Sequence, residues 1–147
     1  MSTVYFNELD TSDLFVDEIE RIFEQEEVIK DLDCSVTIYS EFDDKVSNLS
    51  LPCILISITS PSTEERYSTF DNRQFATRFT LSCEIYSNNI SKYSRKRAVT
   101  RIGDILNEYL TSKYNNFSVS STSLPNIDTN IATKLYRFSG TLENKNN

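Results

Sequence analysis

The chain has 147 residues, of which 38% are hydrophobic, and a formal net charge of -7 at pH 7. A chain of this length makes one domain that buries about two thirds of the surface of its unfolded state, so it needs neither a metal nor a disulfide to fold. The acidic charge argues against non-specific binding to DNA or to anionic membranes, because such partners require a basic face. The sequence has no apolar run of about 18 residues and no basic, apolar leader, so we expect neither a membrane span nor a signal peptide.

Several kinds of chemistry are excluded by residue types that the chain lacks. It contains no histidine, which removes the common nucleophile–base pairs and the common metal sites. Gly103 and Gly140 are its only glycines, so it cannot build the phosphate-binding loops of the Walker or dinucleotide type. We expect Cys34, Cys53 and Cys83 to be reduced cysteines, two of them within apolar strands. The sequence therefore predicts no enzymatic activity, no cofactor and no bound metal.

Residues 11–30 are predicted to form an amphipathic helix, with Thr11 or Ser12 as its N-cap. Apolar side chains at helical spacing form one face, made of Phe15, Ile19, Ile22, Phe23 and Ile29. The opposite face carries Glu20, Glu24 and Glu27. These glutamates form either an ordinary solvated face or a surface that repels or orients a partner.

Two strands are predicted next, over residues 35–41 and 51–59. The first is rich in β-branched and aromatic residues, and the second is apolar on both faces at its start, which favours a central position in the sheet. Pro52 fits at the start of the second strand, where no backbone donor is required.

The segment of residues 60–72 joins this strand to the next one, with which it should pair antiparallel. As a hairpin loop it is long, and long loops in compact domains are often functional. It carries Arg66, Tyr67 and Phe70, and Arg73 follows it. Aromatic and arginine side chains are enriched at protein interfaces, so one interpretation is a protruding binding arm. The other is that the two strands simply extend further and pack these aromatic residues at the end of the sheet.

A strand–turn–helix unit follows, with the strand at residues 73–86 and the helix at 91–114. In the strand, apolar side chains alternate with polar ones, and the apolar set is Phe75, Phe79, Leu81, Cys83 and Ile85. In the helix, the apolar spacing changes to that of one helical face, made of Ala98, Ile102, Ile105, Leu106 and Tyr109. The change of period defines which face of each element points inward.

The start of this helix carries the only basic cluster in an acidic chain, made of Lys92, Arg95, Lys96, Arg97 and Arg101. Cations near a helix N-terminus are slightly unfavourable, so the helix itself does not explain them. The cluster is either a solvated or ion-paired face, or a patch that meets an acidic neighbour such as the glutamates of the first helix on another subunit. Direct contact with nucleic acid is a third, weaker interpretation.

Two more strands are predicted, over residues 117–124 and 131–142, and Gly140 suggests a bulge or a close backbone approach in the last one. The expected fold class is α+β, with an antiparallel sheet, mostly of four to five strands, and two helices on one face, in the order α-β-β-β-α-β-β. The chain is expected to be a single domain, with residues 1–10 as an N-terminal arm and residues 144–147 as a frayed tail.

Four stretches of this pattern, residues 51–58, 79–87, 98–110 and 134–142, together resemble the tail terminator proteins of long-tailed bacteriophages, which are also called tail completion or tail-to-head joining proteins. These stretches include a Leu-Pro before a strand and a final strand with Tyr-Arg-Phe-Ser-Gly. Chain length and element order match as well, and the resemblance covers residues 11–143. The first ten residues depart from the expected pattern.

The resemblance implies a virion protein, assembled in the host cytoplasm, that forms a ring of identical subunits, usually a hexamer. Such a ring sits on the tail tube protein, stops tube polymerisation and offers a surface to the head–tail connector protein, while DNA passes through the lumen without specific binding. A ring needs contacts between two different faces of each subunit, which the acidic helix face and the basic helix start could provide. Two alternatives stay open: a cytosolic protein-binding or regulatory module, and a related head-completion protein of the neck.

Overall fold

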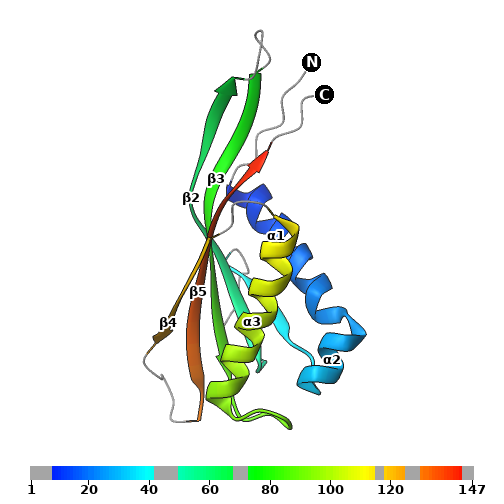
Figure 1. Cartoon of the computed structure of the whole chain (residues 1–147). Coiled ribbons are helices and arrows are strands. Elements are labelled where there is room, and N and C mark those ends of the chain that lie inside the picture. Colours follow the sequence, from blue (N-terminus) through cyan, green and yellow to red (C-terminus); the bar gives the residue numbers. More distant parts are fainter. Residues whose placement is uncertain (1–7, 42–49, 68–72, 115–117, 125–129, 144–147) are drawn as a thin grey trace.

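The computed structural model describes residues 8–41, 50–67, 73–114, 118–124 and 130–143. Helices α1 (Glu8–Glu24) and α2 (Glu26–Leu32) come first and are followed by strands β1 (Thr37–Ser40), β2 (Cys53–Tyr67) and β3 (Arg73–Ser87). Helix α3 (Arg95–Lys113) then leads to strands β4 (Ser118–Leu124) and β5 (Ala132–Glu143). All the described helices lie on the same side of the sheet (Figure 1). The predicted α+β class is confirmed at this level.

The sheet has the strand order β1-β2-β3-β5-β4 and is mixed (Figure 1). β2, β3, β5 and β4 pair antiparallel, as predicted, whereas β1 pairs parallel with β2 through Thr37 and Cys53 at one end and Ser40 and Ile56 at the other. The expectation of a wholly antiparallel arrangement is therefore wrong at this edge. Parallel neighbours need a crossover of about a dozen residues. Residues 41–52 provide that length between β1 and β2.

The predicted first helix is in fact two helices, separated at Gln25, which has extended φ and ψ of -65° and 135°. The first begins at Glu8, so the N-cap expected at Thr11 or Ser12 is wrong, and residues 8–10 belong to the helix rather than to an N-terminal arm. The break moves the second helix out of phase with the first, since residues after Gln25 no longer continue the apolar stripe of α1. Val28 and Leu32 are buried as a result, while Ile29, which was expected on the inner face, is 40% exposed. A count of two helices based on one continuous period of 3.6 is therefore wrong.

The core lies between the helices and one face of the sheet. Alternate residues of β2 and β3 point into it, as the period of two predicts, and Ile54, Ile56, Leu81, Cys83 and Ile85 are all fully buried. Phe15 of α1 packs in the same layer, with its ring centroid 5.0 Å from that of Phe79 and 5.7 Å from that of Tyr114. Burial of each such side chain stabilises the fold by about 1.5–3 kcal/mol before entropy is subtracted.

Gly103 allows α3 to lie directly on β5. A Cβ atom at this position would overlap the ring of Tyr136, because it would lie closer to the ring carbons than Cβ atoms lie to their neighbours in real proteins. Tyr136 is itself buried, and its hydroxyl reaches the backbone oxygen of Thr100 at 3.5 Å. This close approach of helix and strand, rather than a loop, is what requires glycine in the chain.

The hairpin of β2 and β3 runs beyond the helices (Figure 1). Its ladder continues to the pair Tyr67–Arg73, past the pair Ala76–Glu143 where β5 leaves it. The strands therefore extend into the segment of residues 60–72, as one of the two interpretations expects. Residues 68–72 lie outside the described residues, so the packing of Phe70 is not described and the binding arm stays a prediction. A bulge lies in β2 between Thr59 and Ser62, at Pro61, which has no amide hydrogen for the ladder. The register of β3 with β5 runs without a shift past Gly140, so the suggested bulge there is wrong.

Candidate functional site

The basic start of α3 is positioned by a cap that the sequence did not reveal. Ser94 occupies the N-cap position in extended conformation but makes no side-chain cap bond. The cap is supplied instead by Asn89, whose Oδ1 accepts a hydrogen bond from the amide of Arg95 at 2.8 Å. Asn89 belongs to the turn after β3, so the helix starts at a defined place relative to the sheet.

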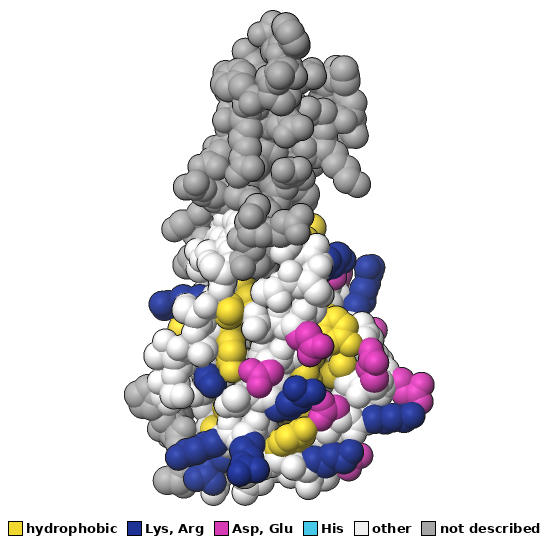
Figure 2. Space-filling model, viewed as in Figure 1, with side chains coloured by type: hydrophobic (Ala, Val, Ile, Leu, Met, Phe, Trp, Pro, Cys, Tyr) yellow, Lys and Arg dark blue, Asp and Glu magenta, His cyan; other side chains and the backbone are white. Residues whose placement is uncertain are grey.

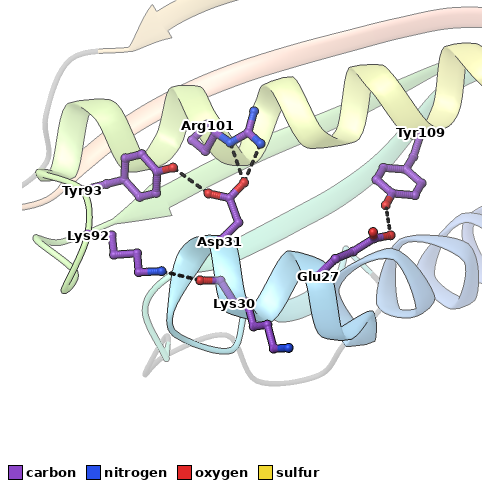
Figure 3. A network of polar contacts seen from close by, with 7 residues as sticks. All are labelled: Glu27, Lys30, Asp31, Lys92, Tyr93, Arg101 and Tyr109. Carbon is purple, nitrogen blue, oxygen red and sulfur yellow. Dashed lines mark hydrogen bonds and ion pairs between the residues drawn. The ribbon is translucent and has the colours of Figure 1, made fainter.

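Two of the five clustered cations are used to attach α3 to α2 (Figure 3). Arg101 donates from Nε and from one terminal nitrogen to Oδ2 of Asp31, at 2.9 and 2.5 Å. Lys92 donates to the backbone oxygen of Lys30 at 2.6 Å, near the C-terminal end of α2, where a cation is favourable. The acidic neighbour of these cations is therefore in the same chain.

Asp31 is the centre of this contact. Its second oxygen, Oδ1, accepts a hydrogen bond from the Tyr93 hydroxyl at 2.6 Å. The hydrogen bonds from Arg101 and then from Tyr93 lower the pKa of the Asp31 carboxyl, and the same carboxylate raises the pKa of the Tyr93 hydroxyl. Because both oxygens are satisfied and the charge is compensated, the cluster explains packing of α2 on α3 and offers no general acid or base.

The other end of α3 is attached to the first two helices by similar contacts. The Tyr109 hydroxyl lies 2.8 Å from Glu27 Oε1 (Figure 3). Gln25 Oε1 lies at the same distance from this hydroxyl. Lys113 forms an ion pair of 2.6 Å with Glu18 of α1. Part of the acidic face of α1 and α2 is thus engaged within the subunit.

Arg95, Lys96 and Arg97 are the remaining cations of the predicted cluster. Lys96 and Arg97 are exposed, and Figure 2 shows Lys and Arg side chains gathered at the lower end of the molecule, over the start of α3. Lys96 lines a groove of about 390 Å³ between α3 and the β4–β5 hairpin, together with Thr100, Ser123 and Lys134. We call this the basic groove. The arrangement brings Lys134, which sequence reasoning missed, to the predicted cluster.

The alternation of side chains along β5 could have identified Lys134. It shares a parity in β5 with Ala132, Tyr136 and Phe138, which are buried on the helix side. Its ammonium lies 3.3 Å from Thr100 Oγ1 and 5.3 Å from the Tyr136 ring centroid. A lysine on the inner parity of a strand is thus the sequence signal for a charge that reaches the end of the helical layer.

A second groove, of about 430 Å³, lies at the opposite edge of the sheet between β1 and the first two helices. We call it the acidic groove, since Glu20 and Glu24 of α1 line it beside an apolar floor of Phe23, Ile29, Val36 and Ile38. The exposed side of Ile29 belongs to it. The helix break at Gln25 creates this groove, and for that reason the sequence reading did not include it.

The other predicted interaction residues lie on the hairpin. Arg66 pairs with Gln74, and Tyr67 with Arg73, in the last two rungs of the β2–β3 ladder. Phe70 lies outside the described residues. The hairpin therefore places Arg66, Tyr67 and Arg73 far from the start of α3 along the sheet, so the predicted site residues fall into two separate groups.

The face of the sheet that the helices leave uncovered carries the predicted polar side chains of β3, but Leu55 of β2 and Leu135 of β5 lie on either side of Glu84. Ser82 and Glu84 of β3 are partly exposed there, and Glu84 accepts a hydrogen bond of 2.5 Å from the Tyr86 hydroxyl. Burial of Tyr86 and then this contact raise the pKa of that hydroxyl. The Tyr86 hydroxyl and the Glu84 carboxylate are thus hydrogen-bonded to each other.

The cysteines are free thiols, as expected, with Cys53 and Cys83 buried and Cys34 half-buried. Burial raises the pKa of Cys53 to about 11 and also raises the pKa of Cys83, so neither is a thiolate at neutral pH.

In the part of the chain that the structure describes, no group of His, Cys, Asp and Glu side chains could hold a metal ion. No described helix is long and apolar enough to cross a membrane. A scan of protein-family models and a search of curated proteins find no match to this chain.

Proposed function

We propose that this chain is a structural virion protein of the tail terminator kind, which forms a ring on the tail tube and joins tail to head. The observation that carries the proposal is the β2–β3 hairpin. Among the described residues, the hairpin continues beyond the pair Ala76–Glu143 with only its own two strands, through Glu65–Phe75, Arg66–Gln74 and Tyr67–Arg73. A two-stranded ribbon is marginally stable in water, so a partner that packs on it supplies the missing contacts.

The composition of this ribbon supports a protein partner. Arg66, Tyr67 and Arg73 are residue types that interfaces enrich. The described part of the chain has free but inert thiols and satisfied carboxylate clusters, which favours an assembly role over catalysis. The resemblance of residues 11–143 to tail terminators assigns the partners: further copies of the chain, the tail tube protein and the head–tail connector.

The proposal is tested by deleting the gene from the genome that carries it and imaging the particles by electron microscopy. The expected result is tails of abnormal length that do not join to heads, restored when the full chain is supplied in trans. Filled heads that leak DNA beside tails of normal length would instead identify a head-completion protein. Normal particles that lack the chain would leave a cytosolic binding module and overturn the proposal.

A further inference from the structure

The sheet ends in two edge strands of different character. Among the described residues, β1 pairs only with β2, and β4 pairs only with β5. β4 is exposed on both faces from Ser118 to Ser123, and its seven residues include no charge, no proline and no glycine. Proteins usually protect an edge strand with charge, proline, a bulge or a covering segment, because its backbone groups are a template for another strand. β4 shows none of the protections that its own sequence could provide.

The two edges lie at the same height along the strands. The rungs that connect them run from Thr122 to Leu135, Glu84, Leu55 and Tyr39. The next rung likewise brings Ser123 of β4 level with Ile38 of β1. A rotation about an axis along the strands therefore brings β4 of one copy beside β1 of the next with no shift along that axis.

The strand directions are also compatible. β1 is parallel to β2, and β4 runs opposite to β5, which itself runs opposite to β3. β4 and β1 consequently point in opposite directions within one copy. When a copy is rotated about an axis along the strands, the two meet as an antiparallel pair.

The grooves beside these edges have opposite charge. The basic groove, with Lys96 and Lys134, touches Ser123 and Leu124 of β4. The acidic groove, with Glu24, touches Thr37 and Ile38 of β1, which are the residues level with that part of β4. Both grooves lie on the helix side of the sheet. Joining the edges thus places a basic groove against an acidic one at the same height.

We propose that β4 of one copy pairs antiparallel with β1 of the next, so that Lys96 and Lys134 face the acidic groove of the neighbour and the sheet continues from copy to copy. This inference deepens the proposed function because it assigns the surface through which the copies assemble. It rests on that function only for the expectation that the assembly closes into a ring. The contact is heterologous, joining two different edges, so its repetition closes a ring when the rotation between copies divides a full turn.

The pairing is tested first by charge reversal in the full chain, with sedimentation velocity at low and high salt. Lys96→Glu and Glu24→Lys should each weaken association of the copies by about tenfold or more, since like charges then face each other. The double variant Lys96→Glu/Glu24→Lys should associate within about threefold of the unchanged chain. Added salt should weaken the unchanged chain and reduce the difference between variants.

Matched controls separate the grooves from general charge effects. Arg97→Glu is the control for Lys96→Glu, because it reverses a positive charge one residue away but outside the basic groove. Asp17→Lys is the control for Glu24→Lys, because it reverses a negative charge on α1 outside the acidic groove. Both should associate like the unchanged chain, and circular dichroism should show all variants folded. Equal effects of Arg97→Glu and Lys96→Glu, no rescue in the double variant, or a chain that stays monomeric both alone and on tail tubes would overturn the proposal.

A second test locates the strands directly. In a Cys34→Ser background, Tyr39→Cys and Thr122→Cys in one chain should give a ladder of oligomers on oxidation, since facing residues in an antiparallel pair have the Cα separation that a disulfide accepts. Ser139→Cys replaces Thr122→Cys as the control, because β5 is an inner strand and Ser139 is also exposed. Ladders of equal intensity in the two variants, or none in the first, would overturn the pairing.

The outcomes also separate this inference from the proposed function. Normal rings on tails with unaffected charge variants leave a tail terminator that assembles by another surface. Charge-dependent oligomers combined with normal particles in the deletion strain leave the edge pairing intact and remove the tail function.

Discussion

The two halves of the β2–β3 hairpin have the same secondary structure but opposite surroundings. From Cys53 to Ile58 the apolar side of β2 lies under the helices, and the inward residues of the paired segment of β3 are buried. Past the bulge at Pro61, the strands continue beyond the helical layer, and after Ala76 they continue without β5 (Figure 1). The comparison teaches that strand pairing alone does not decide stability. The covered half packs in the core, whereas the other half has only its own strand pairing among the described residues, which is the basis of the proposed partner surface.

The largest expected effect on stability lies in the covered half, at Gly103. Gly103→Ala adds a Cβ atom that overlaps the buried Tyr136 ring, so α3 must move away from β5. We expect a loss of about 1–3 kcal/mol in the free energy of unfolding, even though alanine alone favours helix by about 1 kcal/mol. Urea unfolding followed by circular dichroism measures it.

Asp104→Ala is the control for that variant, because it changes the adjacent, exposed helical position. It should leave the unfolding free energy within about 0.5 kcal/mol of the original. Replacing the ring as well, in Gly103→Ala/Tyr136→Val, should recover part of the loss. An unchanged unfolding midpoint for Gly103→Ala would show that α3 and β5 are not in close contact.

A smaller effect is expected where the helices contact each other, at Asp31. Arg101 lowers the pKa of this carboxyl in the folded state, so its contribution to stability is present above the unfolded pKa of about 4 and is lost as the pH falls through the folded value. Asp31→Asn should therefore cost about 1 kcal/mol at pH 7, a value reduced by the partial exposure of the pair. The difference between variant and original should shrink below pH 4 in unfolding curves recorded at several pH values.

Asp33→Asn makes the same chemical change two residues away. Asp33 is exposed and has a positive φ of 55°, which asparagine also accepts. The Asp33→Asn variant should therefore leave the free energy of unfolding nearly unchanged at every pH measured. A pH-independent loss in Asp31→Asn, or an equal loss in Asp33→Asn, would contradict the assigned role of the Arg101 contact.

The smallest effect on stability is expected in the uncovered half of the hairpin. Replacing residues 65–75 with Asn-Gly joins Glu64 to Ala76 through a two-residue turn and keeps every pair of β3 with β5. The unfolding free energy should change by less than about 0.5 kcal/mol. Incorporation of the chain into particles, measured by immunoblotting of purified virions, should be lost.

An informative control for the shortened hairpin keeps its length and changes only its side chains. Arg66→Ser/Tyr67→Ser/Arg73→Ser should reduce incorporation while the ladder persists. If both variants enter particles normally, the ribbon is not the partner-binding surface, and the contrast between the two halves of the hairpin is one of packing alone.

Sequence periodicity was sufficient to predict most of the fold. Alternation in residues 73–86 identified the buried face of β3, and the helical spacing in residues 91–114 identified α3, because each packs one face against the core. The start of residues 51–59, apolar on both faces, favoured an inner place in the sheet, and β2 lies between β1 and β3. The parallel edge at β1 and the break at Gln25 were missed. The direction of a short strand leaves no mark on its side-chain pattern, and a one-residue break changes the phase without interrupting the polar composition.

The candidate site was predictable only in part. Composition located the cations around the start of α3, but Arg101 contacts Asp31, 70 positions earlier, and Lys92 contacts the backbone of Lys30, 62 positions earlier, because folding brings α2 beside them. Lys134 joins Lys96 for the same reason, across the gap between β5 and α3. The chain by itself determined which residues are apolar, charged or able to reverse direction, since these are local properties. Which charges are compensated and which strand edges stay accessible were decided by the tertiary structure, because both depend on neighbours distant in the sequence.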